Sequence, residues 1–233
     1  MKYIVATPVG KQKLYAMKEF IDHLNNLNQL PETLLVSTTP DIFEKCMKFG
    51  ECKFPVKHVH GSEDNADNMV SSITSAREEL RKQSILWMTQ HRALKVEWLL
   101  WLDNDILVFP DLIEVFESLL SKYPNLIMAN SYHPARQDEV KVRHGISCTF
   151  THRDALMGLP FMMACVRGAH LGDDQIWLNT MHHMKGIRGQ SGEKLEVLGG
   201  IFFDVIHLTE DGKKKRFGEQ ENVVIVEENE RNV

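Results

Sequence analysis

Two aspartates, Asp103 and Asp105, are the residues whose types and spacing point most directly to chemistry in this chain of 233 residues. They follow the apolar run "WLLWL" at 98–102, which is typical of a buried strand. Residues two apart at a strand end point the same way, so the two carboxylates are expected to converge, with Asn104 turned aside. Without a cation between them they would repel each other. Because carboxylate oxygens suit hard divalent ions, the pair predicts a Mg²⁺ or Mn²⁺ site.

The acidic pair also has a simpler interpretation, in which it binds no metal. Asp105 would cap the helix that follows Pro110, or both side chains would simply solvate a loop. The apolar lead-in, which includes Trp98 and Trp101, favours the metal site, because an ordinary surface loop has no need of a buried strand before it.

His207 is a candidate third ligand. It lies near the end of the apolar run "LGGIFFDVIHL" at 198–208, far from the acidic pair in sequence. Neutral imidazole is a good ligand for ions such as Mn²⁺. The alternative is a structural histidine at the end of a strand.

A second acidic pair, Asp173 and Asp174, stands in "GDDQIW" at the expected start of a helix. Aspartate is a favoured N-cap residue and the helix dipole stabilises it there. A carboxylate in such a position can also accept a proton as a general base.

Four consecutive basic residues, Lys213 to Arg216, follow His207. A run of this kind is usually a solvated face. Just past a metal ligand its charge could neutralise a leaving anion, and contact with an anionic membrane surface is the competing use.

The elements that position these residues alternate along the first 130 residues. Strands are expected at 3–7, 33–38, 54–61, 98–102 and 125–130, and helices at 14–24, 41–49, 69–80 and 112–119. The alternation predicts an α/β fold with a mostly parallel central sheet and helices on both faces. In such sheets ligands bind beyond the carboxyl ends of the strands, where Asp103 and Asp105 are expected.

The second half of the chain has a different pattern. The segments 144–156, 172–184 and 198–208 are expected to form a strand, a helix and a strand, with more glycine and histidine between them. No Ser/Gly/Pro-rich linker and no internal repeat divides the sequence. We therefore expect one domain over 1–233, with a ligand-binding half at 1–130 and a more irregular half at 131–233.

Composition restricts the class of protein. A formal net charge of −5 argues against a general nucleic-acid binder. The four cysteines form no C-x-x-C pair, which favours a reducing compartment. The first residues are expected to form a strand and not a signal peptide, and no apolar stretch approaches the ~18 residues of a membrane span, so a cytoplasmic location is expected.

The segments "SAREELRKQSI" (75–85) and "VEWLLWLDNDILVFPDLIEVF" (96–116) resemble the core of the GT-A glycosyltransferases. In this family a helix with an Ala-Arg pair precedes an apolar strand that ends in D-x-D. The resemblance is close over 75–130 and diffuse elsewhere. It implies a single Rossmann-like GT-A domain in which the second half faces the acceptor and the basic run lies in a flexible C-terminal loop.

The resemblance also implies roles for individual residues. Asp105 would bind Mn²⁺ or Mg²⁺ directly, Asp103 would contact the ribose or reach the metal through water, and His207 would complete the metal site. Asp174, in preference to Asp173, would be the general base of an inverting transfer. The residues that would contact the nucleotide sugar are Thr7, Pro8 and Val9 in the first loop, Arg77, Asp103, Asn104, Lys213 and Arg216.

The function that follows is a metal-dependent transfer of a sugar from a UDP- or GDP-sugar to a saccharide or another hydroxyl acceptor. A non-catalytic nucleotide-sugar-binding module is the first alternative. A phosphohydrolase of the haloacid dehalogenase type also uses a strand-end D-x-D, but normally near the N-terminus. A nucleotidyltransferase would be expected to have a glycine-rich, basic loop after the first strand, of which "TPVGKQK" at 7–13 is a thin version. The donor, the acceptor, the stereochemistry and the oligomeric state are left open.

Overall fold

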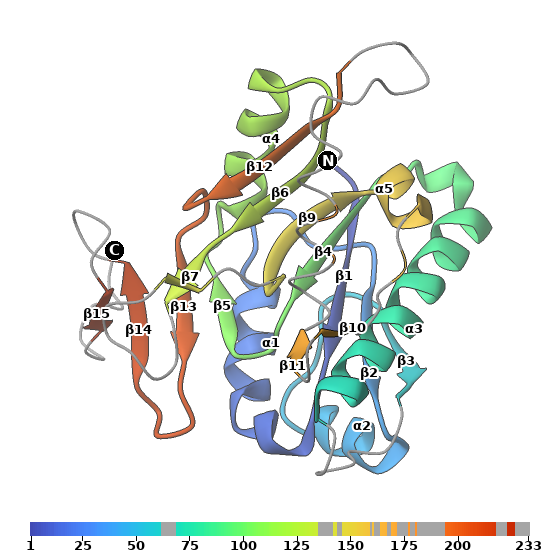
Figure 1. The fold of residues 1–233 in the computed structure, drawn as a ribbon. Coiled ribbons are helices and arrows are strands. Elements are labelled where there is room, and N and C mark those ends of the chain that lie inside the picture. Colours follow the sequence, from blue (N-terminus) through green and yellow to red (C-terminus); the bar gives the residue numbers. More distant parts are fainter. Residues whose placement is uncertain are drawn as a thin grey trace.

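The apolar run at 98–102 forms strand β4 (Trp98–Leu102), which lies inside a seven-stranded sheet (Figure 1). The computed structural model describes residues 1–61, 69–134, 142–143, 146–158, 160, 164–166, 169–171, 177, 180, 194–217 and 223–226. The sheet order is β12-β6-β9-β4-β1-β2-β3. The other six strands are β1 (Tyr3–Pro8), β2 (Leu34–Thr38), β3 (Val56–His60), β6 (Leu126–Ser131), β9 (Cys148–His152) and β12 (Glu196–Gly200).

All strands of this sheet run in one direction except β9. Strands β1 to β4 pair in parallel, as do β6 and β12, whereas β9 is antiparallel to both β4 and β6. The predicted α/β class with a mostly parallel sheet is therefore confirmed. Because β9 runs the other way, its first residues lie beside the carboxyl end of β4, where Leu102 pairs with Cys148.

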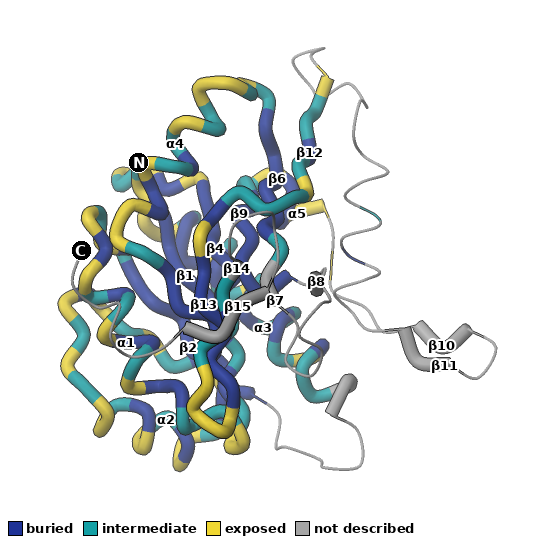
Figure 2. The backbone as a smooth tube through the Cα atoms, turned by 90° about the vertical axis from the view of Figure 1, so that its left-hand side faces the viewer, coloured by how far each residue is buried: buried dark blue, intermediate teal, exposed yellow. Residues whose placement is uncertain are grey.

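The core lies on both faces of the sheet, because alternate residues of a strand point to opposite sides. In β4, Trp98, Leu100 and Leu102 pack into one buried cluster, and Leu99 and Trp101 into the other. This explains why the whole run is apolar, as is usual for strands covered on both faces. Figure 2 shows the resulting distribution, with buried strands inside and the exposed residues on the outer helices and loops.

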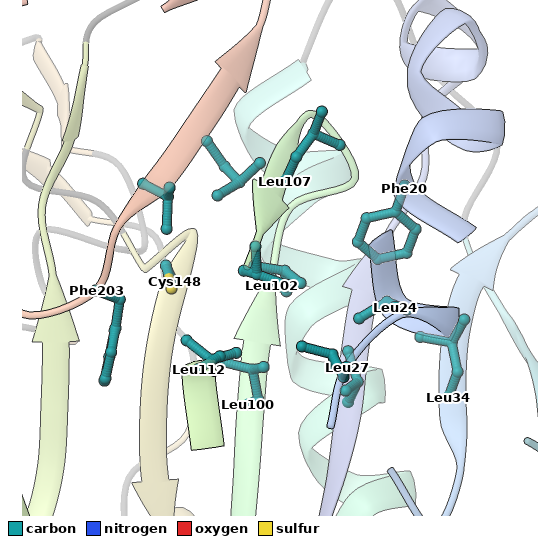
Figure 3. Packing of buried hydrophobic residues seen from close by; sticks show 14 of the residues in the cluster. Phe20, Leu24, Leu27, Leu34, Leu100, Leu102, Leu107, Leu112, Cys148 and Phe203 are labelled. Atoms are coloured by element: carbon teal, nitrogen blue, oxygen red, sulfur yellow. The ribbon is translucent and has the colours of Figure 1, made fainter. Parts of the chain in front are cut away.

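Helices cover both faces. The cluster that contains Leu100 also holds the apolar sides of α1 (Met17–Asn25), α2 (Pro40–Cys46) and α4 (Leu112–Lys122). Figure 3 shows Leu100 and Leu102 in this cluster, with Phe20 and Leu24 on one side and Phe203 on the other. The opposite face is covered by α3 (Met69–Gln90) and α5 (Arg153–Gly158). The helix expected at 69–80 thus continues for another ten residues.

Aromatic rings fix α4 against the sheet. The rings of Phe116 and Phe150 are stacked with centroids 3.9 Å apart, and the ring of Trp98 meets Phe116 edge-on at 4.9 Å. Such pairs add about 0.5–1.5 kcal/mol each beyond the area that they bury. Helix α4 follows the acidic pair in sequence, so its attachment helps to hold the segment between β4 and α4 in place.

A second sheet begins directly after the acidic pair. It has the order β15-β14-β13-β5, with β5 (Ile106–Val108), β13 (Val205–Leu208), β14 (Lys214–Phe217) and β15 (Val223–Val226), and all its pairs are antiparallel. Two further antiparallel pairs are short: β7 (His133–Pro134) with β8 (Val142–Arg143), and β10 (Ala164–Val166) with β11 (Ala169–Leu171).

Two expectations about the second half are wrong. The run 198–208 is not one strand: β12 ends at Gly200 in the central sheet, and β13 begins at Val205 in the second sheet. The backbone N–H groups of Phe202 and Phe203, between the two strands, donate hydrogen bonds to Ser131 Oγ. The basic run is not a loop but forms most of β14. Within the described ranges no helix has the length and apolar character needed to cross a membrane.

Candidate functional site

Asp103 and Asp105 lie in a tight turn that joins the two sheets. The N–H of Ile106 donates to the carbonyl of Asp103 at 2.9 Å, which closes the turn. The N–H of Asp103 donates to the carbonyl of Ser147 at 3.1 Å, and the N–H of Leu208 donates to the carbonyl of Asp105 at 2.8 Å. The turn is thus fixed on one side to Ser147, the residue before β9, and on the other side to β13. The two carboxylates converge, as predicted, because of this turn and not because they share a strand.

An ammonium group lies between the two carboxylates. Lys13 Nζ is 3.2 Å from Asp103 Oδ2 and 2.9 Å from Asp105 Oδ1. Lys13 belongs to the short helix η1 (Lys11–Ala16), which follows the loop after β1. The expected repulsion between the two carboxylates is therefore offset by a cation of the protein itself.

Asp103 has further partners. Ser147 Oγ donates a hydrogen bond to Asp103 Oδ2 at 3.0 Å, and the guanidinium of Arg77 on α3 lies 3.5 Å from Asp103 Oδ1. Burial raises the pKa of Asp103, but the charges of Lys13 and Arg77 outweigh it and lower that pKa to about 2. Asp103 is therefore ionised at neutral pH and is surrounded by donors.

Asp105 is the more deeply buried member of the pair. Its side chain is 2% exposed, and its Oδ2 lies 3.4 Å from Nε2 of His207, which is itself buried on β13. The structure thus brings His207 to the acidic pair, as predicted. Lys215 lies opposite His207 in the pairing of β13 with β14 and is also buried.

Asn104 has a structural position. Its side chain is fully buried, and its Nδ2 donates to the backbone carbonyl of Lys13 at 2.8 Å. Asn104 is not among the described residues that line the neighbouring pocket. It fixes the backbone of Lys13 beside the turn.

The neighbouring pocket opens at the carboxyl ends of β1 and β2. Asp103, Lys13 and Arg77 are part of its lining, together with Pro8, Val9, Gly10, Gln12, Ser37, Thr38, Thr39, Gly61, Ser72, Ile73 and Ala76. Of the first-loop residues predicted to contact a ligand, Pro8 and Val9 line the pocket. Thr7 is fully buried in β1, and its hydroxyl has no hydrogen-bond partner among the described residues.

Lys213, directly before β14, and Arg216, within it, have local acidic partners. Lys213 Nζ lies 2.8 Å from Asp211 Oδ2, and the guanidinium of Arg216 lies 2.7 Å from Asp204 Oδ2. The Arg216 guanidinium is also 5.4 Å from the centre of the Phe109 ring. Neither Lys213 nor Arg216 is among the described lining of the pocket. Their predicted contact with a nucleotide sugar stays a prediction.

The second acidic pair, Asp173 and Asp174, lies outside the described residues. Trp177, three positions after Asp174, is described as helical and is buried on the α3 side of the sheet. The prediction that Asp174 is a general base stays a prediction.

The side chains around the turn are of the types that bind a divalent cation. Two carboxylates and an imidazole are oxygen and nitrogen ligands that Mn²⁺ accepts. Lys13 Nζ already stands as a cation between the carboxylates. Among the described residues no group of three or more His, Cys, Asp or Glu side chains is arranged to hold a metal ion. The acidic pair therefore has the right ligand types, while an ammonium group holds the position between them.

Lys13 and Ser147 are the site residues that the sequence analysis missed. Lys13 stands 90 positions before Asp103, and only the basic loop "TPVGKQK" after the first strand could have indicated it. Ser147 lies beside Asp103 because β9 runs antiparallel to β4, and the local sequence does not indicate that direction.

Comparisons with known proteins give a likeness in structure but none in sequence. No family model matches the sequence, and a search of curated proteins finds no match. Among solved structures, A197 from STIV is similar over 97% of this chain and 95% of that chain, with a TM-score of 0.52 and 10% identity.

Two further solved structures are less similar. TarS 1-349 from S. aureus, in complex with UDP-GlcNAc, has a TM-score of 0.49 and 13% identity over 85% of this chain and 56% of that chain, so this chain spans little more than half of it. Glucosyl-3-phosphoglycerate synthase from Mycobacterium tuberculosis was solved in complex with Mn²⁺, UDP and phosphoglyceric acid. It has a TM-score of 0.46 and 9% identity over 86% of this chain and 69% of that chain.

At these identities the likeness concerns the fold alone. The mostly parallel sheet, the helices on both faces and the acidic turn at the carboxyl end of β4 agree with the fold that the sequence resemblance implies. The chain has an α/β fold with a mostly parallel seven-stranded sheet and helices on both faces.

Proposed function

We propose that this protein is a metal-dependent glycosyltransferase, which transfers a sugar from a nucleotide diphosphate sugar to a hydroxyl acceptor. The observation that carries the proposal is the pocket at the carboxyl ends of β1 and β2, because Asp103, Lys13 and Arg77 all line it. In an open α/β sheet this is the edge where ligands bind. A pocket that combines a carboxylate with two cations suits a ligand with ribose hydroxyls and a diphosphate.

The two parts of such a donor need different surroundings. Pro8, Val9, Thr38 and Gly61 give the pocket a wall of small side chains and loop backbone, against which a base and a ribose can pack. Lys13 and Arg77 supply positive charge for the phosphates. Asp103 can accept hydrogen bonds from ribose hydroxyls, since its low pKa keeps it ionised.

Asp105, Asp103 and His207 are the residues that would hold the metal. When bound there, Mn²⁺ or Mg²⁺ supplies charge neutralisation for the diphosphate leaving group. Asp105 is the central ligand in this proposal, because it lies beside both Lys13 and His207. Arg77 remains beside Asp103 and orients that carboxylate toward the pocket.

The acceptor half of the proposal rests on the sequence resemblance. Asp174, in preference to Asp173, would take the proton from the attacking hydroxyl in an inverting transfer. Asp174→Asn should spare donor binding and lower the transfer rate by roughly 10²- to 10⁴-fold. Calorimetry with Mn²⁺ and a transfer assay on the same variant separate these two effects. Normal transfer by the variant would remove Asp174 from the mechanism.

Lys215, together with Lys213 and Arg216, is proposed to neutralise the charge of the leaving diphosphate. Lys215 is buried and faces His207 across the β13–β14 pair. Peripheral contact of this basic strand with an anionic membrane is the alternative use of its charge. Binding to vesicles that contain phosphatidylserine, compared with neutral vesicles, distinguishes the two uses.

The donor can be tested with a thermal-shift panel. UDP- and GDP-sugars are added with and without Mn²⁺, to the wild-type protein and to Asp105→Asn. A ligand at 100 times its Kd adds about 2.7 kcal/mol to the stability of the folded state, which gives a clear rise in Tm. The proposal predicts a rise that needs both Mn²⁺ and Asp105.

A nucleotidyltransferase is a second candidate, and the position of Lys13 favours it. Lys13 lies on η1, directly after the loop that follows the first strand, and its side chain reaches the acidic pair; that class is expected to carry a basic residue after the first strand. The same panel therefore includes CTP and UTP. A Tm rise with nucleoside triphosphates, and none with nucleotide sugars, would favour this second candidate.

A further inference from the structure

The backbone and the side chain of Lys13 are held differently. The backbone is fixed, because Asn104 donates to the Lys13 carbonyl and the Lys13 N–H donates to the carbonyl of Gly10 at 3.0 Å. The side chain, which is 17% exposed, lines the pocket and ends between Asp103 and Asp105. A lysine side chain has a flexible four-carbon stem, so its ammonium group can move while its backbone stays in place.

The ammonium group and a divalent cation would compete for the same oxygens. Lys13 Nζ contacts Asp103 Oδ2 and Asp105 Oδ1, which are oxygens that a metal at this pair would use. Two cations cannot both occupy the space between these oxygens, since like charges at contact distance repel strongly in a buried site. Metal binding therefore requires that the ammonium group leaves.

The charges of the site indicate where the ammonium group goes. Among the described residues, Lys13 contacts both carboxylates and Arg77 contacts Asp103, so the formal charges of these four groups cancel without any ligand. A divalent cation on its own would give the site an excess of positive charge. A nucleoside diphosphate in the pocket would remove that excess, and it would offer phosphate oxygens to the displaced ammonium group.

We propose that Lys13 is an internal counter-ion of the acidic pair, which holds the metal position until a nucleoside diphosphate enters the pocket. This inference rests on the proposed function and adds a property to it. The metal alone binds weakly, the metal and the diphosphate bind together, and Lys13 couples the two. By linkage each ligand raises the affinity for the other by the same factor.

The test measures Mn²⁺ binding directly by electron paramagnetic resonance, with and without saturating UDP or GDP. Four proteins are compared: wild type, Lys13→Met, Lys13→Arg and Lys18→Met. Lys18→Met is the matched control, because Lys18 also contacts an aspartate at 2.9 Å but is exposed on α1. Circular dichroism checks that each variant is folded.

Wild type and Lys18→Met should bind Mn²⁺ weakly alone, and a nucleoside diphosphate should raise that affinity by a factor of about 5 to 150, the range typical of coupled sites. Lys13→Met should bind Mn²⁺ alone at least several-fold more tightly than wild type, with little further gain from the nucleotide. Lys13→Arg, which keeps a cation, should remain weak for Mn²⁺ alone.

Three results would overturn the inference. If Lys13→Met and wild type bind Mn²⁺ alone equally, Lys13 does not hold the metal position, although the proposed function survives when the nucleotide still raises Mn²⁺ affinity. If the wild type binds Mn²⁺ tightly without nucleotide, there is no coupling, and this result needs no variant. If no protein binds Mn²⁺ in any condition, the proposed metal-dependent function is wrong as well.

Discussion

Lys13 Nζ lies 2.9 Å from Oδ1 of Asp105, although the two residues are 92 positions apart in the sequence. This contact changes how the acidic pair is understood, because the carboxylates are held in an ion-pair network before any ligand binds. Removal of one carboxylate therefore breaks a buried ion pair and should destabilise the protein. From the sequence alone, the same change was expected to relieve repulsion between the two carboxylates.

Asp105→Asn should destabilise the metal-free protein by up to about 3 kcal/mol, because Lys13 and His207 both lose a charged partner in a buried place. Urea unfolding measures this difference. Asp22→Asn is the matched control: it breaks an exposed pair with Lys18 of the same length, and it should cost at most about 0.5 kcal/mol. Equal stabilities for Asp105→Asn and Asp22→Asn would show that the buried network contributes nothing.

Asp103 should make the metal-free protein sensitive to acid. Its pKa is lowered from 3.8 to about 2 in the folded state, so its stabilising effect is complete above about pH 4 and is lost as the pH falls toward 2. The contribution at neutral pH is about 2 kcal/mol. In urea unfolding, the difference between wild type and Asp103→Asn should shrink between pH 5 and pH 2.5. A constant difference over that range would contradict the assignment.

His207→Gln should raise the Mn²⁺ concentration needed for activity by about 10- to 100-fold, with partial recovery at saturating metal. The reason is that two carboxylate ligands remain. His152→Gln is the control, since His152 faces the exposed Asp154 and is not at the acidic turn. An unchanged Mn²⁺ titration for His207→Gln would leave His207 with a purely structural role.

Asn104→Ala should change both stability and Mn²⁺ affinity through its effect on Lys13. The variant leaves the Lys13 carbonyl without its side-chain donor, which costs about 1–3 kcal/mol in a buried place. It should also loosen the position of the Lys13 ammonium group, so that Mn²⁺ alone binds more tightly than to wild type. A loss of stability with unchanged Mn²⁺ affinity would limit Asn104 to a structural role.

Local sequence pattern was sufficient for the strand that leads into the acidic pair. Strand β4 has the bounds expected for it, because five buried residues between a charged residue and Asp103 leave little choice. The same reasoning failed at 198–208, where two strands of different sheets are separated only by residues 201–204, three of which are apolar. It also failed at the basic run, because Lys215 is buried by pairing with β13, a long-range contact that the composition of the run does not reveal.

The candidate site was predictable only in part. The acidic pair and His207 were found because they end apolar runs, and the structure brings them together. Lys13 and Ser147 are placed by the meeting of η1, β4 and β9 at one edge of the sheet, which depends on strand order and direction. No spacing within the sequence contains that information.

The most direct test of the central claim is release of nucleoside diphosphate from a panel of UDP- and GDP-sugars, with Mn²⁺ present, by wild type and by Asp105→Asn. Slow hydrolysis of the correct donor is expected even without an acceptor. We predict that wild type releases the diphosphate from at least one nucleotide sugar, and that Asp105→Asn is at least about 100-fold slower on the same sugar. Equal rates for the two proteins, or no release from any sugar in the panel, would contradict the proposal.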